Sequence, residues 1–410
     1  MKNLKNNKKK KTKKWILPRH AFIRNAANIV YGPHVRRKYN VKIKPFTEQG
    51  DRNYLVLYNH QTAADQFFVG MAFRGAVYYL ASEDIFSLGF LSKLLRFAVN
   101  PIPIKKQTND PRAVINCIKV AKEGGTIAIA PEGNRTYAGR LMYIKPSIAQ
   151  LAKHLKLPIA IFQIENGYGV HPRWSDEVRR GTMTAGVSRV IEVDEMLSLS
   201  DEELCALIER ELNVNEERTD RIYEGHHLAE YIERAMYVCP RCGLSRFESH
   251  GDTTECKRCS MKIKHLSTTE LVSEDEAFRF KFAAEWYEYQ CSYINALDTT
   301  KNLAEPIYED TAALYEVVLY KNKKILEKSS DIKLYGDRMS VSTGDGELLI
   351  PFAEASALAV LGKNKLNVYF GDKVYQIKGD ERFNALKYVN LYYRYQQISK
   401  GDCDDKFLGL

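Results

Sequence analysis

The sequence predicts an α/β domain, followed by a small cysteine-rich ribbon and then a β-rich, barrel-like domain with a C-terminal helix. In the first half, two apolar strands each end in a compact polar motif. Open α/β sheets collect reacting groups at such strand ends. Two cysteine pairs follow, and the last part of the chain alternates between short strands and turn signals. At 410 residues the chain is long enough for two or three domains.

The first of these strands, residues 54–58, leads into Asn59 and the spacing His60-x4-Asp65. Residues five apart on a helix lie roughly 140° apart, so these two side chains meet only if His60 lies on the turn and Asp65 in or near the first turn of the next segment. The pair predicts proton abstraction, with His60 as the base and Asp65 holding its tautomer. Taken alone, a histidine at a strand end is more often only a hydrogen-bonded polar residue of the fold than a catalytic base.

The second strand, residues 126–130, ends in Pro-Glu-Gly-Asn-Arg-Thr at residues 131–136. Glu132 supplies an acceptor or an orienting carboxylate, and Gly133 lets the backbone approach a ligand closely. Arg135 offers a planar fork for phosphate. The alternative is a turn with a surface ion pair. Because both motifs follow strands, we expect them to converge on one site.

Together these motifs resemble the glycerophospholipid acyltransferases, the group of 1-acyl-glycerol-3-phosphate acyltransferases. The histidine–aspartate spacing is followed about seventy residues later by Pro-Glu-Gly-x-Arg-Thr, in the family's order. Residues 100–106 occupy the place of the family's phosphate-binding segment, and residues 157–161 match its proline-containing strand. The resemblance covers roughly residues 45–195 and implies a mixed sheet flanked by helices.

The chain departs from the family pattern at several positions. Lys106, or alternatively Lys105, stands where the family has an arginine, and lysine binds phosphate as a point charge rather than as a fork. Asn134 and Thr136 stand where threonine and serine are commoner, and the second proline of the fourth motif is missing. These departures leave the reaction class in place and the acceptor headgroup open.

The resemblance implies transfer of a fatty acyl group from a thioester, acyl-CoA or acyl carrier protein, to the hydroxyl of a lysophospholipid, most simply 1-acyl-glycerol-3-phosphate. His60 acts as general base and Asp65 orients it. The substrate-binding residues are then Lys106, Glu132, Gly133 and Arg135. No serine or cysteine motif of nucleophilic catalysis is present, so a direct ternary mechanism is favoured over an acyl-enzyme.

The positive charge of the chain is concentrated at its N-terminus. Residues 1–47 carry fifteen Lys and Arg and no acid, so subtracting +15 from the net +10 leaves −5 for the remainder. The composition predicts a basic, disordered tail over residues 1–19. Phe22, Ala26 and Ile29 then fall on one face of a short amphipathic helix. A polybasic run beside such a helix favours a cytoplasmic enzyme held peripherally at an anionic membrane surface. A purely solvated tail and nucleic-acid binding are the alternatives, the latter less favoured.

Four cysteines, Cys239, Cys242, Cys256 and Cys259, form two C-x2-C knuckles thirteen residues apart. This spacing supplies four thiolates for one tetrahedral zinc ion, and four cysteine ligands leave no open position for catalysis. The zinc is therefore expected to be structural. The remaining cysteines are scattered, which is typical of reducing cytosol.

The predicted domains are the acyltransferase domain at 20–230, the zinc ribbon at 231–265, a helical connector at 266–310 and a β domain at 311–400. A capping box at Ser200 opens a helix, and a second helix is expected around 217–236. A further helix is expected from Ser273, with an aromatic stripe.

Some eight short strands between 315 and 377, followed by a helix over 381–399, resemble a pleckstrin-homology-like barrel capped by its helix. Such a modular chain leaves a rival function open, namely a non-catalytic adaptor that binds nucleic acid or proteins through ribbon, tail and barrel.

Overall fold

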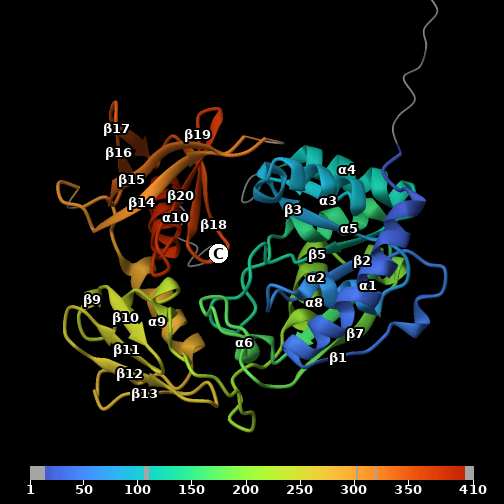
Figure 1. Cartoon of the computed structure of the whole chain (residues 1–410), viewed down its shortest axis with the longest axis horizontal. Helices are drawn as coiled ribbons and strands as arrows, with labels where there is room; N and C mark the ends of the chain where they lie inside the picture. The colour runs from blue at the N-terminus through green and yellow to red at the C-terminus, as the bar shows by residue number, and fades with distance from the viewer. Residues whose placement is uncertain (1–13, 106–109, 302, 319–320, 402–410) are drawn as a thin grey trace, which may run out of the picture.

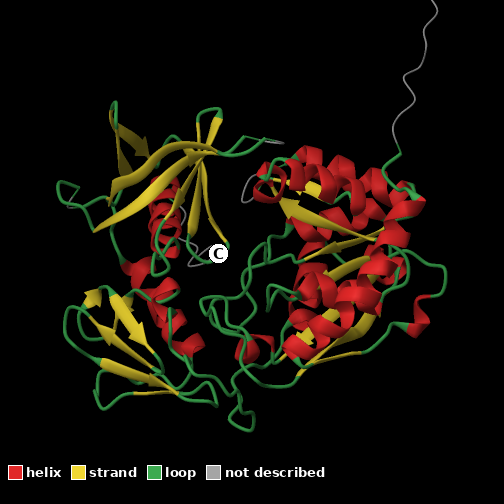
Figure 2. Ribbon diagram, viewed as in Figure 1, coloured by secondary structure: helices red, strands yellow, loops and turns green. Residues whose placement is uncertain are grey.

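The computed structural model describes residues 14–105, 110–301, 303–318 and 321–401. The chain forms an α/β lobe and, beside it, a small ribbon and a curled antiparallel sheet, as Figures 1 and 2 show. The α/β lobe comes first in the chain, and the ribbon and the antiparallel sheet follow on the other side of the molecule.

A seven-stranded mixed sheet forms the centre of the α/β lobe. Its order is β1-β7-β6-β2-β5-β3-β4, and every neighbouring pair is parallel except β6 with β7. This agrees with the predicted mixed sheet. The strands are β1 (Val41–Ile43), β2 (Leu55–Tyr58), β3 (Val77–Ser82), β4 (Ile102–Ile104), β5 (Thr126–Ile129), β6 (Ile159–Glu165) and β7 (Met183–Ile191).

Helices cover both faces of this sheet, which is why β2 is apolar on both sides. Val56 packs into a core with α1 and α2, whereas Leu55 and Leu57 pack into a second core with α4, α5 and α8. The capping box of Ser200 and Glu203 opens α8, as predicted. The helices are α1 (Pro18–Tyr39), α2 (Asp65–Ala72), α3 (Phe90–Ala98), α4 (Pro111–Lys122), α5 (Ser147–Leu155), α6 (Gly167–Val170), α7 (Val193–Ser198) and α8 (Asp201–Leu212).

The ribbon consists of a two-stranded and a four-stranded antiparallel sheet. The first pairs β8 with β9, and the second has the order β10-β11-β12-β13. Helix α9 (Ala283–Ala296) follows the ribbon and leads toward the C-terminal sheet. The strands are β8 (Val238–Cys239), β9 (Gly243–Leu244), β10 (Phe247–His250), β11 (Thr253–Cys256), β12 (Lys262–His265) and β13 (Leu271–Val272).

The C-terminal sheet has the order β17-β16-β15-β14-β20-β19-β18, with antiparallel pairing throughout. Within the described residues β17 and β18 are unpaired edges, so the sheet is a curled half-barrel. Helix α10 (Leu386–Lys400) packs on it, and the Tyr392 hydroxyl donates to the Ala355 carbonyl at 2.8 Å. The strands are β14 (Tyr308–Glu316), β15 (Lys324–Leu334), β16 (Arg338–Thr343), β17 (Gly346–Pro351), β18 (Ala355–Leu361), β19 (Lys365–Phe370) and β20 (Lys373–Lys378).

The structure differs from the predicted elements of the second half in four places. The two strands predicted around 325–327 and 332–335 are one strand, β15, because β14 pairs with it almost throughout. The helix predicted around 217–236 is wrong: its backbone bonds to other segments, for example Tyr223 N–H to the Ser267 carbonyl, and only a 3₁₀ turn remains at Ile232–Arg234. The last predicted helix, over 381–399, begins only at Leu386.

The helix predicted from Ser273 begins ten residues later than expected. The Ser273 hydroxyl donates to the Lys262 carbonyl and does not cap a helix. Helix α9 instead begins at Ala283, where Glu285 accepts from the backbone N–H of Phe282. A serine followed by acidic residues can cap a helix or can hydrogen-bond to a neighbouring strand. The sequence does not distinguish the two, because the second depends on the tertiary structure.

The N-terminal helix is longer than predicted, since α1 begins at Pro18 and ends at Tyr39. Trp15 lies within the predicted tail, yet its backbone N–H donates to the Glu123 carboxylate and its indole N–H to the Asn100 carbonyl at 3.1 Å. The lysine run before Lys14 lies outside the described residues. In the described part of the chain, no helix combines the length and apolarity needed to cross a bilayer.

Candidate active site

His60 and Asp65 meet at the carboxyl end of β2, as predicted. Nδ1 of His60 lies 2.8 Å from Oδ2 of Asp65. Asp65 is the first residue of α2, so the histidine lies on the turn and the aspartate in the first helical turn. The His60 side chain is 23% exposed, whereas that of Asp65 is 0% exposed. The imidazole therefore reaches the surface with its carboxylate buried behind it.

Asp65 is held in place by donors from the same turn. Its carboxylate accepts from the backbone N–H of Gln61 at 2.7 Å and of Thr62 at 2.9 Å, and from the Thr62 hydroxyl at 2.6 Å. These donors compensate for the burial of the charge. With His60 Nδ1–H donated to this carboxylate, the neutral imidazole carries its lone pair on Nε2. That tautomer is the one a general base needs.

The second motif reaches the first because β5 pairs directly with β2, placing Ile129 opposite Leu57. Glu132 accepts the His60 backbone N–H on Oε1 at 2.6 Å and the Met142 N–H on Oε2 at 2.9 Å. Burial raises the pKa of Glu132 to about 8, and these two N–H groups act in the opposite sense. Both carboxylate oxygens thus serve backbone donors, one of them on the predicted base.

Arg135 is partly buried beside the histidine turn. Its Nη2 donates to the His171 carbonyl at 2.6 Å and its Nε to the Gln61 carbonyl at 3.3 Å. Burial lowers the pKa of Arg135 to about 10, while nearby Asp65 favours the charged form. Arg135 therefore remains a cation at neutral pH, next to the His60–Asp65 pair.

Of the two remaining residues predicted to bind substrate, the structure describes Gly133 but not Lys106. Gly133 is exposed in a turn, with φ of +71°, and its N–H donates to the Ala130 carbonyl at 3.0 Å. This left-handed conformation favours glycine. Lys106 lies outside the described residues. Its described neighbour Lys105 donates its backbone N–H to Asp110 at 3.0 Å.

Three residues that shape the site were missed by the sequence analysis. Asn59 exchanges two 2.8 Å hydrogen bonds with the backbone of Ile164 and so ties the end of β2 to β6. In the sequence, the position of Asn59 directly before His60 could have indicated this role. His171 and Arg173 lie in a loop far along the chain, and in the sequence only the intervening proline marks it as a turn.

Residues 30–164 match the family model described as Acyltransferase, and this range contains both motifs. This stretch belongs to the acyltransferase family. The chain is also similar to the crystal structure of the 1-acyl-sn-glycerophosphate (LPA) acyltransferase PlsC from Thermotoga maritima. The identity is 18% and the TM-score 0.36, over 46% of this chain and 90% of that one. No curated protein matches the sequence. The lobe that contains residues 30–164 is called the acyltransferase domain below.

The four ribbon cysteines lie together as a metal site requires. All four Sγ atoms are within 4.8 Å of one another, and two pairs, Cys239 with Cys259 and Cys242 with Cys256, are 3.6 Å apart. Tetrahedral Zn–S bonds imply sulfur–sulfur distances of about 3.8 Å. The cysteines therefore fit one zinc ion. His250 is exposed and contacts Glu248, so it is not needed as a ligand.

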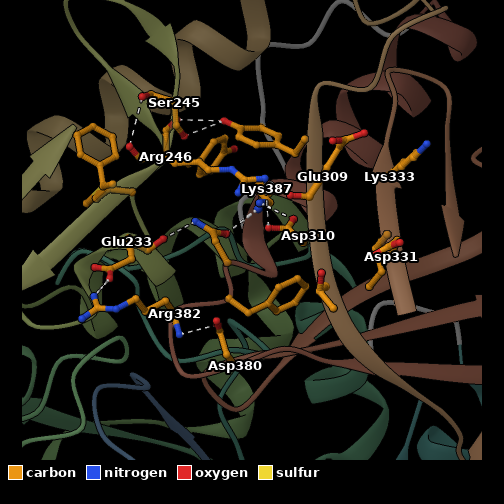
Figure 3. Close-up of a pocket in the computed structure, with 18 residues that line it drawn as sticks. Glu233, Ser245, Arg246, Glu309, Asp310, Asp331, Lys333, Asp380, Arg382 and Lys387 are labelled. Atoms are coloured by element: carbon orange, nitrogen blue, oxygen red, sulfur yellow. Dashed lines mark hydrogen bonds and ion pairs between the residues drawn. The ribbon is translucent and has the colours of Figure 1, made fainter. Parts of the chain in front are cut away.

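A polar cavity of about 720 Å³ lies between the ribbon, strands β14 and β15, and the start of α10 (Figure 3). Buried Lys387 pairs with Asp310 at 2.6 Å and lies 4.3 Å over the Tyr308 ring. Arg382 pairs with Glu233 at one side of the cavity. The first pair joins α10 to β14, and the second joins the segment between β20 and α10 to the segment before the ribbon. None of these charges lies in the His60 motif turns.

Replacing Glu132 by Gln is expected to lower kcat on the order of a hundredfold, because an amide has one acceptor oxygen for two backbone N–H groups. Turnover measured with saturating substrates checks this. Glu217→Gln, which alters a partly buried glutamate paired with Arg140, is the matched control. Unchanged turnover in the Glu132 variant would show that the carboxylate does not hold the base.

Removing metal from the ribbon is expected to lower the thermal unfolding midpoint, because four thiolates otherwise face one another without a cation. Elemental analysis should find about one zinc per chain, and Cys259→Ser should reduce that content. Re-addition of zinc should restore the midpoint of the chelated protein. A metal-free protein with the same midpoint would contradict the assignment.

Proposed function

We propose that the protein transfers a fatty acyl group from an acyl thioester, acyl-CoA or acyl carrier protein, to the hydroxyl of a lysophospholipid, most simply 1-acyl-glycerol-3-phosphate. The observation that carries the proposal is the 2.8 Å contact between His60 Nδ1 and buried Asp65, within a stretch that belongs to the acyltransferase family. A thioester already has a good leaving group, so a base and correct positioning suffice.

In this reaction Nε2 of His60 takes the proton of the acceptor hydroxyl as its oxygen attacks the thioester carbonyl. The carbon–sulfur bond breaks, an ester forms, and the imidazolium returns its proton to the departing thiolate. Asp65 stabilises the imidazolium because its buried carboxylate remains hydrogen-bonded to Nδ1. No covalent enzyme intermediate is needed.

The remaining site residues position the base and the acceptor. Glu132 holds the backbone of His60. Arg135 carries a positive charge beside the pair and is assigned to the acceptor's phosphate. The exposed backbone at Gly133 lets the headgroup approach closely. Lys106, four residues before Asp110 in the sequence, is assigned to the same phosphate.

The proposal places the enzyme at the cytoplasmic face of an anionic membrane, held by an apolar surface of α1 and α3. This α1/α3 surface has four strongly exposed side chains on α3, and the two helices are in contact. Trp15, just after the lysine run, bonds to Asn100, just after α3. Lys14, the last lysine of the run, therefore directly precedes a residue that is bonded beside the apolar surface, and the proposal combines these two membrane signals. The exposed residues are Phe22, Ile29, Val30, Tyr31, Phe90, Leu91, Leu94 and Phe97.

Replacing His60 by Ala is expected to reduce acyl transfer on the order of a thousandfold or more, because general-base catalysis contributes about that factor. Release of free thiol from an acyl thioester, followed with and without 1-acyl-glycerol-3-phosphate, measures it. His154→Ala, at an exposed histidine on α5, is the matched control.

Three outcomes of this assay decide the function. Thiol release that requires both the acceptor and His60 supports acyl transfer. Equal release without an acceptor identifies a thioesterase. Absence of release with any lysophospholipid acceptor would favour the adaptor alternative.

Replacing Phe90 and Leu94 by Glu is expected to weaken binding to phosphatidylserine-containing vesicles about tenfold or more, because two apolar contacts become charges. Vesicle sedimentation measures this. Leu197→Glu is the matched control, because Leu94 and Leu197 are both 48% exposed but Leu197 lies on α7, away from this surface. Equal binding of all variants would place the membrane contact elsewhere.

A further inference from the structure

The loop of residues 171–176, which follows α6, lies directly behind Arg135. The carbonyl of His171 accepts the Arg135 guanidinium at 2.6 Å. Burial lowers the pKa of His171 to about 2, and the next contributions come from the charges of Arg135 and Lys363. The imidazole is therefore neutral. A cation of the acyltransferase domain and one of the C-terminal sheet both act on this histidine.

Arg173, in the same loop, connects Arg135 to the C-terminal sheet. Its Nη1 donates to the Arg135 carbonyl at 3.1 Å, and its Nη2 donates to the Gly362 carbonyl at 3.2 Å. The guanidinium also lies 4.4 Å over the ring of Tyr137, two residues beyond Arg135. Arg173 is only 4% exposed. One buried side chain thus spans from the second motif to the turn between β18 and β19.

Lys363, the next residue of that turn, holds the other end of the loop. Its Nζ donates to the Ser175 carbonyl at 2.6 Å and pairs with the Asp176 carboxylate. Arg234, just before the ribbon, pairs with Asp176 at 2.7 Å and also donates to the Trp174 carbonyl. Burial alone raises the pKa of Asp176, but the bonds from Arg234 and Lys363 lower it to about 2. The ion pairs therefore persist across the physiological pH range.

The turn itself is held by its backbone conformation and by side-chain hydrogen bonds. Gly362 has φ of +60°, which favours glycine, and Asn364 donates to the carbonyls of Gly379 and Asp380 at 3.0 and 2.7 Å. The same sheet meets the acyltransferase domain at a second point, where Asp84 accepts from Gln376 at 3.1 Å and pairs with Lys323. Two separate contacts thus fix the sheet against the domain.

We propose that the C-terminal sheet completes the acceptor site, its β18–β19 turn fixing the position of Arg135 through Arg173 and Lys363. Arg173 and Lys363 are positioning residues, because both act through the loop and the Arg135 backbone and not on the substrate. This inference rests on the proposed function, in which Arg135 binds the acceptor phosphate. It also gives the appended sheet a role in acceptor selectivity.

The turn would act by fixing the position of the Arg135 guanidinium. Arg135 has two bonds from its guanidinium to backbone carbonyls, and one of these carbonyls belongs to the loop that the turn holds. If the contacts between the turn and the loop are lost, the loop shifts, and the Arg135 guanidinium moves with the His171 carbonyl to which it donates. A displacement of this kind weakens a contact between the guanidinium and the acceptor phosphate far more than it affects a thioester bound elsewhere.

The test is Lys363→Ala in the full-length protein, assayed with 1-acyl-glycerol-3-phosphate and with a monoacylglycerol that lacks the phosphate. We expect KM for the phosphate-bearing acceptor to rise on the order of tenfold, because a charge-assisted contact is lost. KM for the acyl thioester and activity toward the monoacylglycerol should not change. Lys363→Arg, which retains the charge, should restore most of the acceptor KM.

Lys373→Ala is the matched control, because Lys373 is an exposed lysine at the adjacent β19–β20 turn. Thermal unfolding of each variant separates misfolding from misplacement, since a general loss of structure would lower turnover with both acceptors. An unchanged preference for the phosphate-bearing acceptor in Lys363→Ala would overturn the inference while leaving acyl transfer intact. If the wild-type protein itself transfers no acyl group, the proposed function fails, and the inference fails with it.

Discussion

The two hydrogen bonds that Glu132 accepts are the interaction on which the site depends. Its buried carboxylate receives the backbone N–H of His60 and that of Met142, so it joins the turn after β2 to the loop after β5. This geometry exists because β2 and β5 are parallel neighbours and end at the same edge of the sheet. The orientation of the imidazole toward Asp65 then follows from a backbone that is already held.

The position of both motifs at strand ends explains why ionisable side chains are tolerated inside the domain. Asp65 and Glu132 are buried and Arg135 is partly buried, and each is compensated by backbone groups of turns and loops. Such compensation requires irregular backbone, which occurs where strands end. A charged site in the middle of the sheet would lack these donors and acceptors. The ionisable residues of the site therefore lie at strand ends because backbone groups that can stabilise them are available there.

The second half of the chain packs against the loops of the candidate site. Tyr287 of α9 stacks on Tyr137 with rings 6.0 Å apart, and Glu288 pairs with Arg140. At the β18–β19 turn, the Gly362 carbonyl accepts from Arg173 of the loop behind Arg135, and Lys363 donates to the Ser175 carbonyl of that loop. The ribbon is joined to the C-terminal sheet at the polar cavity, where Arg382 donates to the Ser249 carbonyl of β10 at 2.9 Å. The site is therefore backed by contacts from two regions far from it in the sequence, α9 and the β18–β19 turn.

Local patterns in the sequence were sufficient wherever the structure is local. The His60–Asp65 geometry follows from a five-residue spacing across one turn, and the cysteine cluster follows from two knuckles. The Ser200 capping box likewise depends on residues three apart. The prediction failed at 217–236, where backbone groups bond to Ser267 and Gly251 rather than within a helix.

What the sequence by itself determined is the set of functional groups: a histidine with its carboxylate, a second motif with an acid and an arginine, and four cysteines. Only the tertiary structure decided that Glu132 holds the backbone of His60 and that Arg135 is held by His171 and, through Arg173, by the C-terminal sheet. The physical reason is that these bonds go to backbone carbonyls and N–H groups. Every residue carries such groups, so no residue type or spacing in the sequence marks the partner.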